Sequence, residues 1–266
     1  QISVAIPVYN SEASLRPLVE RLKPVLDAVA DAYEVVLVND GSRDMSWQVI
    51  QSLAAEYSWV RGINLMRNYG QHNALLCALR ALRFPITITM DDDLQHPPEE
   101  VPKLLEKFNN GFELVYGTPR EERHGLLRDL ASVFTKLALQ SAMGVDIARK
   151  VGPFRVFRTD LRKAFDKYSG SFISIDVLLT WGTTNVGAVA VRHEERKYGA
   201  SNYTVKKLVM HAFNMMTGFI HCDLLRRAAI LPRHHRGISG PHALPYARQT
   251  AIHHRRRNGR QDPEHR

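Results

Sequence analysis

The 266-residue sequence is poor in cysteine and lacks long apolar runs. Its two cysteines, Cys77 and Cys222, provide no disulfide framework, which is typical of a protein from a reducing compartment. No apolar run reaches the roughly 18 residues that a membrane-spanning helix needs, because the longest one, residues 208–220, is interrupted by a histidine and an asparagine. Strand-like residues begin at Ile2 without a charged leader, which predicts no signal peptide. We therefore expect a chain with no transmembrane helix.

The formal net charge of +9 is concentrated at one end of the sequence. Residues 1–220 hold 26 Lys and Arg against 24 Asp and Glu, whereas residues 221–266 hold 10 Arg against 3 acidic residues. The sequence thus predicts a folded domain over residues 1–220 and an Arg- and His-rich tail over residues 221–266. Because the tail has few large apolar residues, it cannot bury enough surface to offset chain entropy, and we expect it to be disordered.

Strand-like and helix-like segments alternate along most of the chain. Near-continuous apolar strands separated by helices are typical of a parallel sheet that is covered on both faces. We expect strands at residues 2–8, 33–38, 60–65, 86–90, 112–116, 151–158 and 186–193, and helices at residues 12–30, 45–57, 71–82, 99–109, 126–143 and 174–181. The predicted fold class is α/β, with a Rossmann-like, mostly parallel sheet, helices on both faces and a C-terminal amphipathic helix at residues 205–219.

Polar residues follow four of the predicted strands. Asn10, Asp40, Arg67 and Asp91 each stand just beyond a strand end. In parallel sheets ligands bind beyond the carboxyl ends of the strands, so we expect these four residues to share one binding edge.

Three consecutive carboxylates, Asp91 to Asp93, end the strand at residues 86–90. Carboxylates cannot be left unpaired away from water, so a cation is expected there. On an extended segment alternate side chains point the same way, so Asp91, Asp93 and Gln95 would converge on one ion while Asp92 faces elsewhere. Oxygen ligands favour Mg or Mn over zinc. The alternative is a solvated acidic turn in front of a helix.

A second charged group follows the predicted break at residues 117–120. Arg120, Arg123 and Arg128, with the hydroxyl of Ser132, would supply the guanidinium forks that match phosphate oxygens. This pattern indicates an anion pocket, and a solvated helix face is the alternative.

Five motifs follow one another along the chain: Pro7-Val8-Tyr9-Asn10, Asn39-Asp40-Gly41-Ser42, Arg67-Asn68-Tyr69-Gly70, Asp91-Asp92-Asp93-Leu94-Gln95-His96-Pro97-Pro98 and Arg196-Lys197-Tyr198-Gly199-Ala200-Ser201-Asn202-Tyr203. Together they resemble family 2 glycosyltransferases of the GT-A fold. The aspartate run and the last motif are similar to those of polyprenyl-phosphate sugar transferases, of the dolichol-phosphate mannose synthase and undecaprenyl-phosphate glycosyltransferase type. The resemblance covers residues 1–220.

The resemblance implies inverting, metal-dependent transfer of a sugar from a nucleotide diphosphate sugar to a polyprenyl phosphate. It implies donor-binding roles for Pro7, Tyr9, Asn10, Glu12, Asp40, Arg67, Asp92, Arg196 and Ser201. It assigns Mg or Mn to Asp91, Asp93 and Gln95, and the acceptor phosphate to Arg120, Arg128 and Ser132. The departing diphosphate needs positive charge, which a metal and Arg196 would supply.

The identity of a general base is open at the sequence level. Many relatives carry an aspartate in the segment that here reads Gly152-Pro153-Phe154-Arg155, and Asp176 is the candidate substitute. A phosphate oxygen is already ionised near neutral pH, so a strong base is not obviously required.

The resemblance implies an enzyme that is membrane-associated and works at the cytoplasmic face of the membrane in building the cell envelope. It leaves open whether the enzyme forms a homo-oligomer. Two alternatives remain: a family 2 transferase that acts on a saccharide acceptor, and a nucleic-acid binder that uses the arginines of the tail. The near-neutral body argues against nucleic acid as a partner.

Overall fold

The computed structural model describes residues 1–119, 151–170 and 174–195. Several predictions lie outside these residues: the helix at residues 126–143, the amphipathic helix at residues 205–219, the tail at residues 221–266, and the roles of Arg120, Arg123, Arg128, Ser132, Arg196 and Ser201.

The first half of the chain alternates strands and helices as the sequence predicts. The elements are β1 (Ile2–Val8), α1 (Glu12–Val29), β2 (Tyr33–Asn39), α2 (Ser46–Glu56), β3 (Val60–Asn64), α3 (Gln71–Ala81) and β4 (Ile86–Thr89). All seven match predicted segments to within one or two residues at each end.

The second half is more irregular. It contains the 3-10 helix η1 (Pro98–Glu100), α4 (Val101–Asn109), β5 (Leu114–Pro119), β6 (Arg155–Arg158), the 3-10 helix η2 (Thr159–Ala164), α7 (Ile175–Gly182) and β7 (Val186–Val191). The 3-10 helix η2 has no counterpart among the predicted segments, and the strand expected at residues 151–158 begins only at Arg155.

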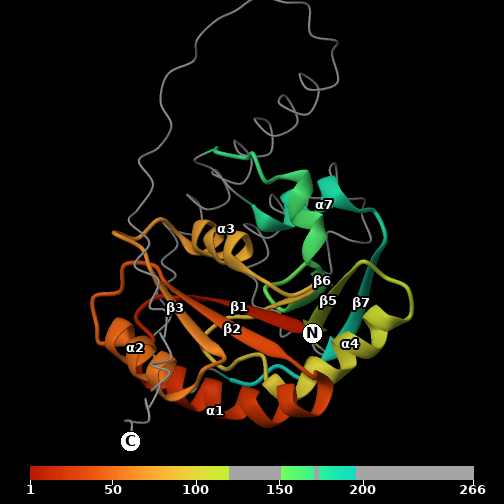
Figure 1. Ribbon diagram of the computed structural model, residues 1–266. Helices are drawn as coiled ribbons and strands as arrows, with labels where there is room; N and C mark the ends of the chain where they lie inside the picture. Colours follow the sequence, from red (N-terminus) through yellow and green to blue (C-terminus); the bar gives the residue numbers. More distant parts are fainter. Residues whose placement is uncertain (120–150, 171–173, 196–266) are drawn as a thin grey trace, which may run out of the picture.

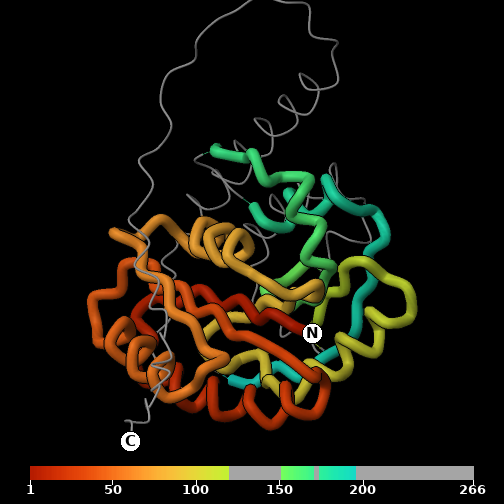
Figure 2. The backbone as a smooth tube through the Cα atoms, in the orientation of Figure 1, coloured from red at the N-terminus to blue at the C-terminus, as the bar shows by residue number. Residues whose placement is uncertain are grey.

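The described strands form one sheet in the order β3-β2-β1-β4-β6-β5-β7. Every neighbouring pair is parallel except the two that involve β6, which runs antiparallel to both β4 and β5. Figure 2 shows β3, in orange, at the left of the molecule and β7, in teal, at the right, which are the two ends of this strand order. The mostly parallel α/β fold is therefore confirmed.

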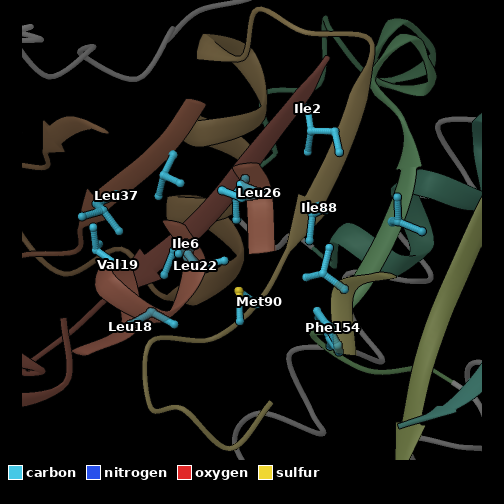
Figure 3. Close-up of a cluster of buried hydrophobic side chains, with 14 of the residues drawn as sticks. Ile2, Ile6, Leu18, Val19, Leu22, Leu26, Leu37, Ile88, Met90 and Phe154 are labelled. Carbon is cyan, nitrogen blue, oxygen red and sulfur yellow. The ribbon is translucent and has the colours of Figure 1, made fainter. Parts of the chain in front are cut away.

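Helices cover both faces of this sheet (Figure 1). On one face α1, α2 and α4 pack against the sheet, and on the other face α3, α7 and η2 do so. Leu15, Leu18, Leu22 and Leu26 recur at helical spacing on α1 and are fully buried. Figure 3 shows three of them against Ile6 and Leu37 of the sheet, so apolar burial holds the strand ends in place.

The break predicted at residues 117–120 is wrong for its described part, because β5 continues to Pro119 in parallel pairing with β7. Gly117 lies within the strand, and a Cβ there would come 2.9 Å from the Phe154 ring and 3.2 Å from Val191. The glycine therefore permits close side-chain packing and does not form a turn. Among the described residues, no helix combines the length and apolar character needed to cross a membrane.

Candidate active site

The parallel order β3-β2-β1-β4 brings four polar residues to one edge of the sheet. Asn10, Asp40, Arg67 and Asp91 each follow the carboxyl end of one of these strands. Pro7, the predicted donor residue in β1, is buried one residue before the end of that strand. The expected common edge is thus present, and the ligand contacts of these residues remain predictions.

Asp40 ties the end of β2 to the loop between β3 and α3. Its carboxylate accepts hydrogen bonds from the backbone N–H groups of Tyr69 (2.7 Å) and Gly70 (2.9 Å). The next residue, Gly41, has a φ of 64°, and a Cβ there would lie 2.5 Å from the backbone of Arg67. Glycine is needed because the two loops approach so closely. Burial raises the pKa of Asp40 to about 6, against the opposing effect of the two backbone hydrogen bonds.

Asn10 and Glu12 tie the turn after β1 to the turn after β2. Asn10 has a φ of 54°, its N–H donates to Ser42 Oγ (3.0 Å), and its side-chain oxygen accepts from the N–H of Arg43 (2.8 Å). The carboxylate of Glu12 accepts from the N–H of Met45, directly before α2 (2.7 Å). Two predicted donor residues therefore join their own turn to the turn after β2 by accepting hydrogen bonds from its backbone.

The aspartate run does not continue as an extended segment, as the sequence analysis assumed. Residues 92 and 93 form a turn and residues 94–96 a bend, and Leu94 has a φ of 61°. This backbone turns the Leu94 side chain into the core, where it is 3% exposed. Burial of the leucine thus accounts for the turn, and strand alternation does not apply here.

Each carboxylate of the run has a different partner. Asp92 accepts from the N–H of Tyr9 (3.2 Å), Asp91 accepts from the side-chain amide of Gln71 (2.6 Å), and Asp93 accepts from the N–H of Gln95 (3.1 Å). Burial raises the pKa of Asp92 to about 6. Asp92 therefore faces β1 and Asp91 faces α3, while the convergence of Asp91, Asp93 and Gln95 on one ion stays a prediction.

The predicted ligands suit a hard divalent cation. Two carboxylates and one amide oxygen, from Asp91, Asp93 and Gln95, are the oxygen donors that Mg²⁺ and Mn²⁺ prefer. No cluster of three or more His, Cys, Asp or Glu that could hold a metal occurs among the described residues. The amide oxygen of Gln95 would be the third donor from this segment, and this role stays a prediction.

Asp176, the candidate base, sits in a buried polar cluster at the start of α7. It forms an ion pair with Arg155 and accepts a hydrogen bond from the Tyr116 hydroxyl (3.0 Å). Arg155 is 1% exposed and pairs with Thr89 at the end of β4, so the cluster lies beside the aspartate run. Burial, and next the charge of Asp176, raises the pKa of Tyr116 well above its usual value. These partners favour a positioning role for Asp176.

Pro153, at the position where the family resemblance leads us to expect an aspartate, contributes its backbone carbonyl group. The carbonyl oxygen of Pro153 accepts a hydrogen bond from Thr89 Oγ1 (2.8 Å). The segment before β6 is thereby tied to the end of β4 through an uncharged group.

Sequence reasoning missed two polar side chains at this edge. Gln71, the first residue of α3, holds Asp91, and the ring of His193 lies 3.3 Å from the amide nitrogen of Gln95, measured at Nε2. Both residues stand at element ends, Gln71 after the Arg67–Gly70 motif and His193 two residues after β7. Their position next to the end of a helix or strand is the sequence signal that could have identified them, because Asn10, Asp40 and Asp91 are predicted site residues for the same reason.

Comparison with known proteins gives a family match and close relatives. The family model described as Glycosyl transferase family 2 matches residues 3–165. An undecaprenyl-phosphate 4-deoxy-4-formamido-L-arabinose transferase from Shewanella sediminis is 36% identical over 84% of this chain and 68% of its own length. Proteins of the same name from Aeromonas hydrophila and Pseudomonas aeruginosa are 35% identical over 83% and 81% of this chain. The chain spans 67% and 64% of their lengths, about two thirds in each case.

A solved structure shares the fold. Glucosyl-3-phosphoglycerate synthase from Mycobacterium tuberculosis, in complex with Mn²⁺, UDP and glucosyl-3-phosphoglycerate, superposes with a TM-score of 0.62 at 18% identity. The match covers 87% of this chain and 81% of that one. At this identity the likeness shows the GT-A fold.

Proposed function

The chain belongs to glycosyl transferase family 2, and we propose on this premise that it transfers a sugar from a nucleotide diphosphate sugar to a polyprenyl phosphate, with inversion at the anomeric carbon. The observation that carries the proposal is the 36% identity, over 84% of the chain, to a transferase named for undecaprenyl phosphate. We place the reaction at the cytoplasmic face of the membrane.

The edge formed by the turns after β1, β2 and β3 is the proposed donor site. Pro7, Tyr9 and Asn10 would border the nucleoside on one side, and Asp40 with Arg67 on the other. The loops that carry these residues are already joined by the hydrogen bonds of Asp40, Asn10 and Glu12. A site braced in this way needs little rearrangement when it binds its ligand.

Asp91, Asp93 and Gln95 would hold a divalent cation beside this donor site. When bound, that cation would supply positive charge to the departing diphosphate. Arg196 would add a second cationic group, and Arg120, Arg128 and Ser132 would receive the acceptor phosphate. Gln71 would keep Asp91 oriented through their 2.6 Å hydrogen bond.

The nucleophile of this reaction does not need a strong base. The second pKa of a phosphate monoester is about 6, so its oxygen is largely ionised at neutral pH. This chemistry is compatible with an Asp176 that is engaged by Arg155 and Tyr116, and with Pro153 in place of an aspartate. The chain would then act mainly by positioning two phosphates and screening their charge.

The test is sugar incorporation with two classes of acceptor. A panel of nucleotide sugars, including a nucleoside diphosphate 4-deoxy-4-formamido-L-arabinose, is first screened by thermal shift with Mn²⁺. The labelled donor that binds is then incubated with undecaprenyl phosphate or with a saccharide, and organic-extractable label is counted. We expect label in the lipid phase only with undecaprenyl phosphate. Transfer only to the saccharide would instead support the alternative acceptor class.

A further inference from the structure

The segment that leaves β7 is bound to the segment that follows the aspartate run. The backbone N–H of Glu194 donates to the carbonyl oxygen of Gln95 (2.8 Å). Arg21, on α1, forms a two-pronged ion pair with Glu99 and also reaches Glu194 at 3.4 Å. Residues 192–194 and 95–100 therefore lie together although about a hundred positions separate them in the sequence.

A buried carboxylate anchors the same junction. Glu100 is 1% exposed and accepts hydrogen bonds from the backbone N–H (3.2 Å) and Nε (2.7 Å) of Arg192, and it also pairs with Lys103. Burial opposes the charge of Glu100, but the bonds from Lys103 and Arg192 outweigh this effect and lower its pKa. The backbone on both sides of His193 is thus fixed.

The ring of His193 contacts the ring of a second histidine, His96. Its centroid lies 5.0 Å from that of His96, which is 7% exposed and lies 5.4 Å from the Phe154 ring. Within the described part of the chain, Nδ1 of His96 is buried without a hydrogen-bond partner, so His96 serves here as a packing surface. This edge-to-face contact, with an interplanar angle of 69°, helps to orient the imidazole of His193 toward Gln95.

The contact with Gln95 joins two nitrogens, His193 Nε2 and Gln95 Nε2, at 3.3 Å. The amide NH₂ group can only donate, so the imidazole Nε2 is the acceptor. A fixed NH₂ group also fixes the amide oxygen, which points away from the ring. That oxygen is the third ligand proposed for the divalent cation.

We propose that His193 is a positioning residue that holds the Gln95 amide with its oxygen turned toward the cation beside Asp91 and Asp93. The role is that of an outer-shell partner, which touches a ligand and not the reacting groups. It rests on the proposed function, because Gln95 acts as a ligand only if a cation binds with the donor diphosphate.

The test uses three replacements of His193 that separate packing from hydrogen bonding. His193→Phe keeps a ring against His96 but removes the acceptor nitrogen, His193→Ala removes both, and His193→Gln supplies a carbonyl oxygen that can accept from the Gln95 amide. His193 is exposed, so we expect all three full-length variants to keep the wild-type melting temperature without metal.

The readout is Mn²⁺ affinity, measured by electron paramagnetic resonance of the free ion with saturating UDP and, in parallel, with GDP. We expect His193→Phe and His193→Ala to weaken Mn²⁺ binding about tenfold, the lower end of outer-shell effects, and His193→Gln to stay within about twofold of wild type. In a Gln95→Ala background His193→Phe should have no further effect, because the residue that it positions is absent.

The outcomes separate this inference from the function on which it rests. Wild-type affinity in His193→Phe, or equal weakening in His193→Gln and His193→Phe, overturns the positioning role alone. If the wild-type chain fails to bind Mn²⁺ both in the presence of UDP and in the presence of GDP, the metal-dependent donor site and the positioning role are both wrong.

Discussion

Asp40 and Gly70 are 30 positions apart in the sequence, yet the backbone N–H of Gly70 donates a 2.9 Å hydrogen bond to the Asp40 carboxylate. The N–H of Tyr69 donates a second one. One buried carboxylate thereby holds the loops after β2 and β3 together at the edge where the donor would bind. The same burial has a consequence for stability.

The raised pKa of Asp40 predicts that stability falls as the pH rises. Burial moves this pKa from 3.8 to about 6, so the folded chain holds the proton more tightly than the unfolded chain does. The free energy of unfolding is then highest below about pH 4 and decreases until about pH 6, by roughly 3 kcal/mol for the whole shift. We expect Asp40→Asn to lack this part of the decrease.

Urea unfolding of the wild type and of Asp40→Asn checks this prediction. The free energy of unfolding is measured at several pH values between 4 and 7, a range that covers most of the shift in the Asp40 pKa. The pKa of Asp92 is also raised, but Asp92 is present in both proteins and its contribution cancels in the difference. If the two free-energy curves run parallel across this range, the proton on Asp40 does not contribute.

Removal of one negative charge from the proposed cation site should abolish transfer and leave the fold intact. We expect Asp91→Asn or Asp93→Asn to lower kcat by at least about 100-fold, because the cation loses a charged ligand and the diphosphate its counter-charge. Asp27→Asn is the matched control, since that exposed carboxylate pairs with Lys23 and with Tyr33 at the opposite edge of the sheet. Undiminished turnover in a chelator would count against the metal itself.

Local signals account for the elements that could be predicted. The strands at Ile2–Val8 and Tyr33–Asn39 are apolar runs that end at turn residues, so composition and turn chemistry agree there. The extension of β5 to Pro119 and the antiparallel direction of β6 depend on pairing with distant strands. No local pattern encodes such pairing, which is why the sequence predicts a break at Gly117.

The candidate site could also be predicted only where local sequence signals exist. Asn10, Asp40 and Asp91 could be found because they follow strands, and parallel strands end at a common edge. Which aspartate bonds to Gln71 and which to Tyr9 could not be predicted, since both hydrogen bonds join segments that are far apart in the sequence. The bend at Leu94 was missed because it reflects burial of one side chain against residues far away in the sequence.

Arg128, which lies outside the described residues, is predicted from the sequence to bind the acceptor phosphate. We expect Arg128→Ala to raise KM for undecaprenyl phosphate about tenfold or more and to leave KM for the nucleotide sugar nearly unchanged. Arg158→Ala is a suitable control, because this exposed arginine ends β6 at the edge where β4 begins. Equal increases in both KM values would remove the acceptor assignment.

The ion pair between Asp176 and Arg155 predicts a stability defect in single variants. Both side chains are buried, so Asp176→Leu leaves the guanidinium without its counter-charge. Loss of one partner of a buried pair typically costs about 3–5 kcal/mol, which corresponds to a melting temperature lower by about 10 °C in a domain of this size. We expect Arg155→Met to show a similar loss, and the double replacement to recover much of the stability, since it buries no unpaired charge.

Enzyme activity then distinguishes this positioning role from that of a general base. If Asp176 only positions Arg155 and Tyr116, the double variant should recover kcat along with its melting temperature when assayed well below the transition. A general base contributes about 100- to 10,000-fold to the rate, and no replacement by leucine could restore that contribution. A double variant that is stable but remains inactive by this factor would therefore establish Asp176 as the base, and the proposed sufficiency of an ionised acceptor phosphate would be wrong.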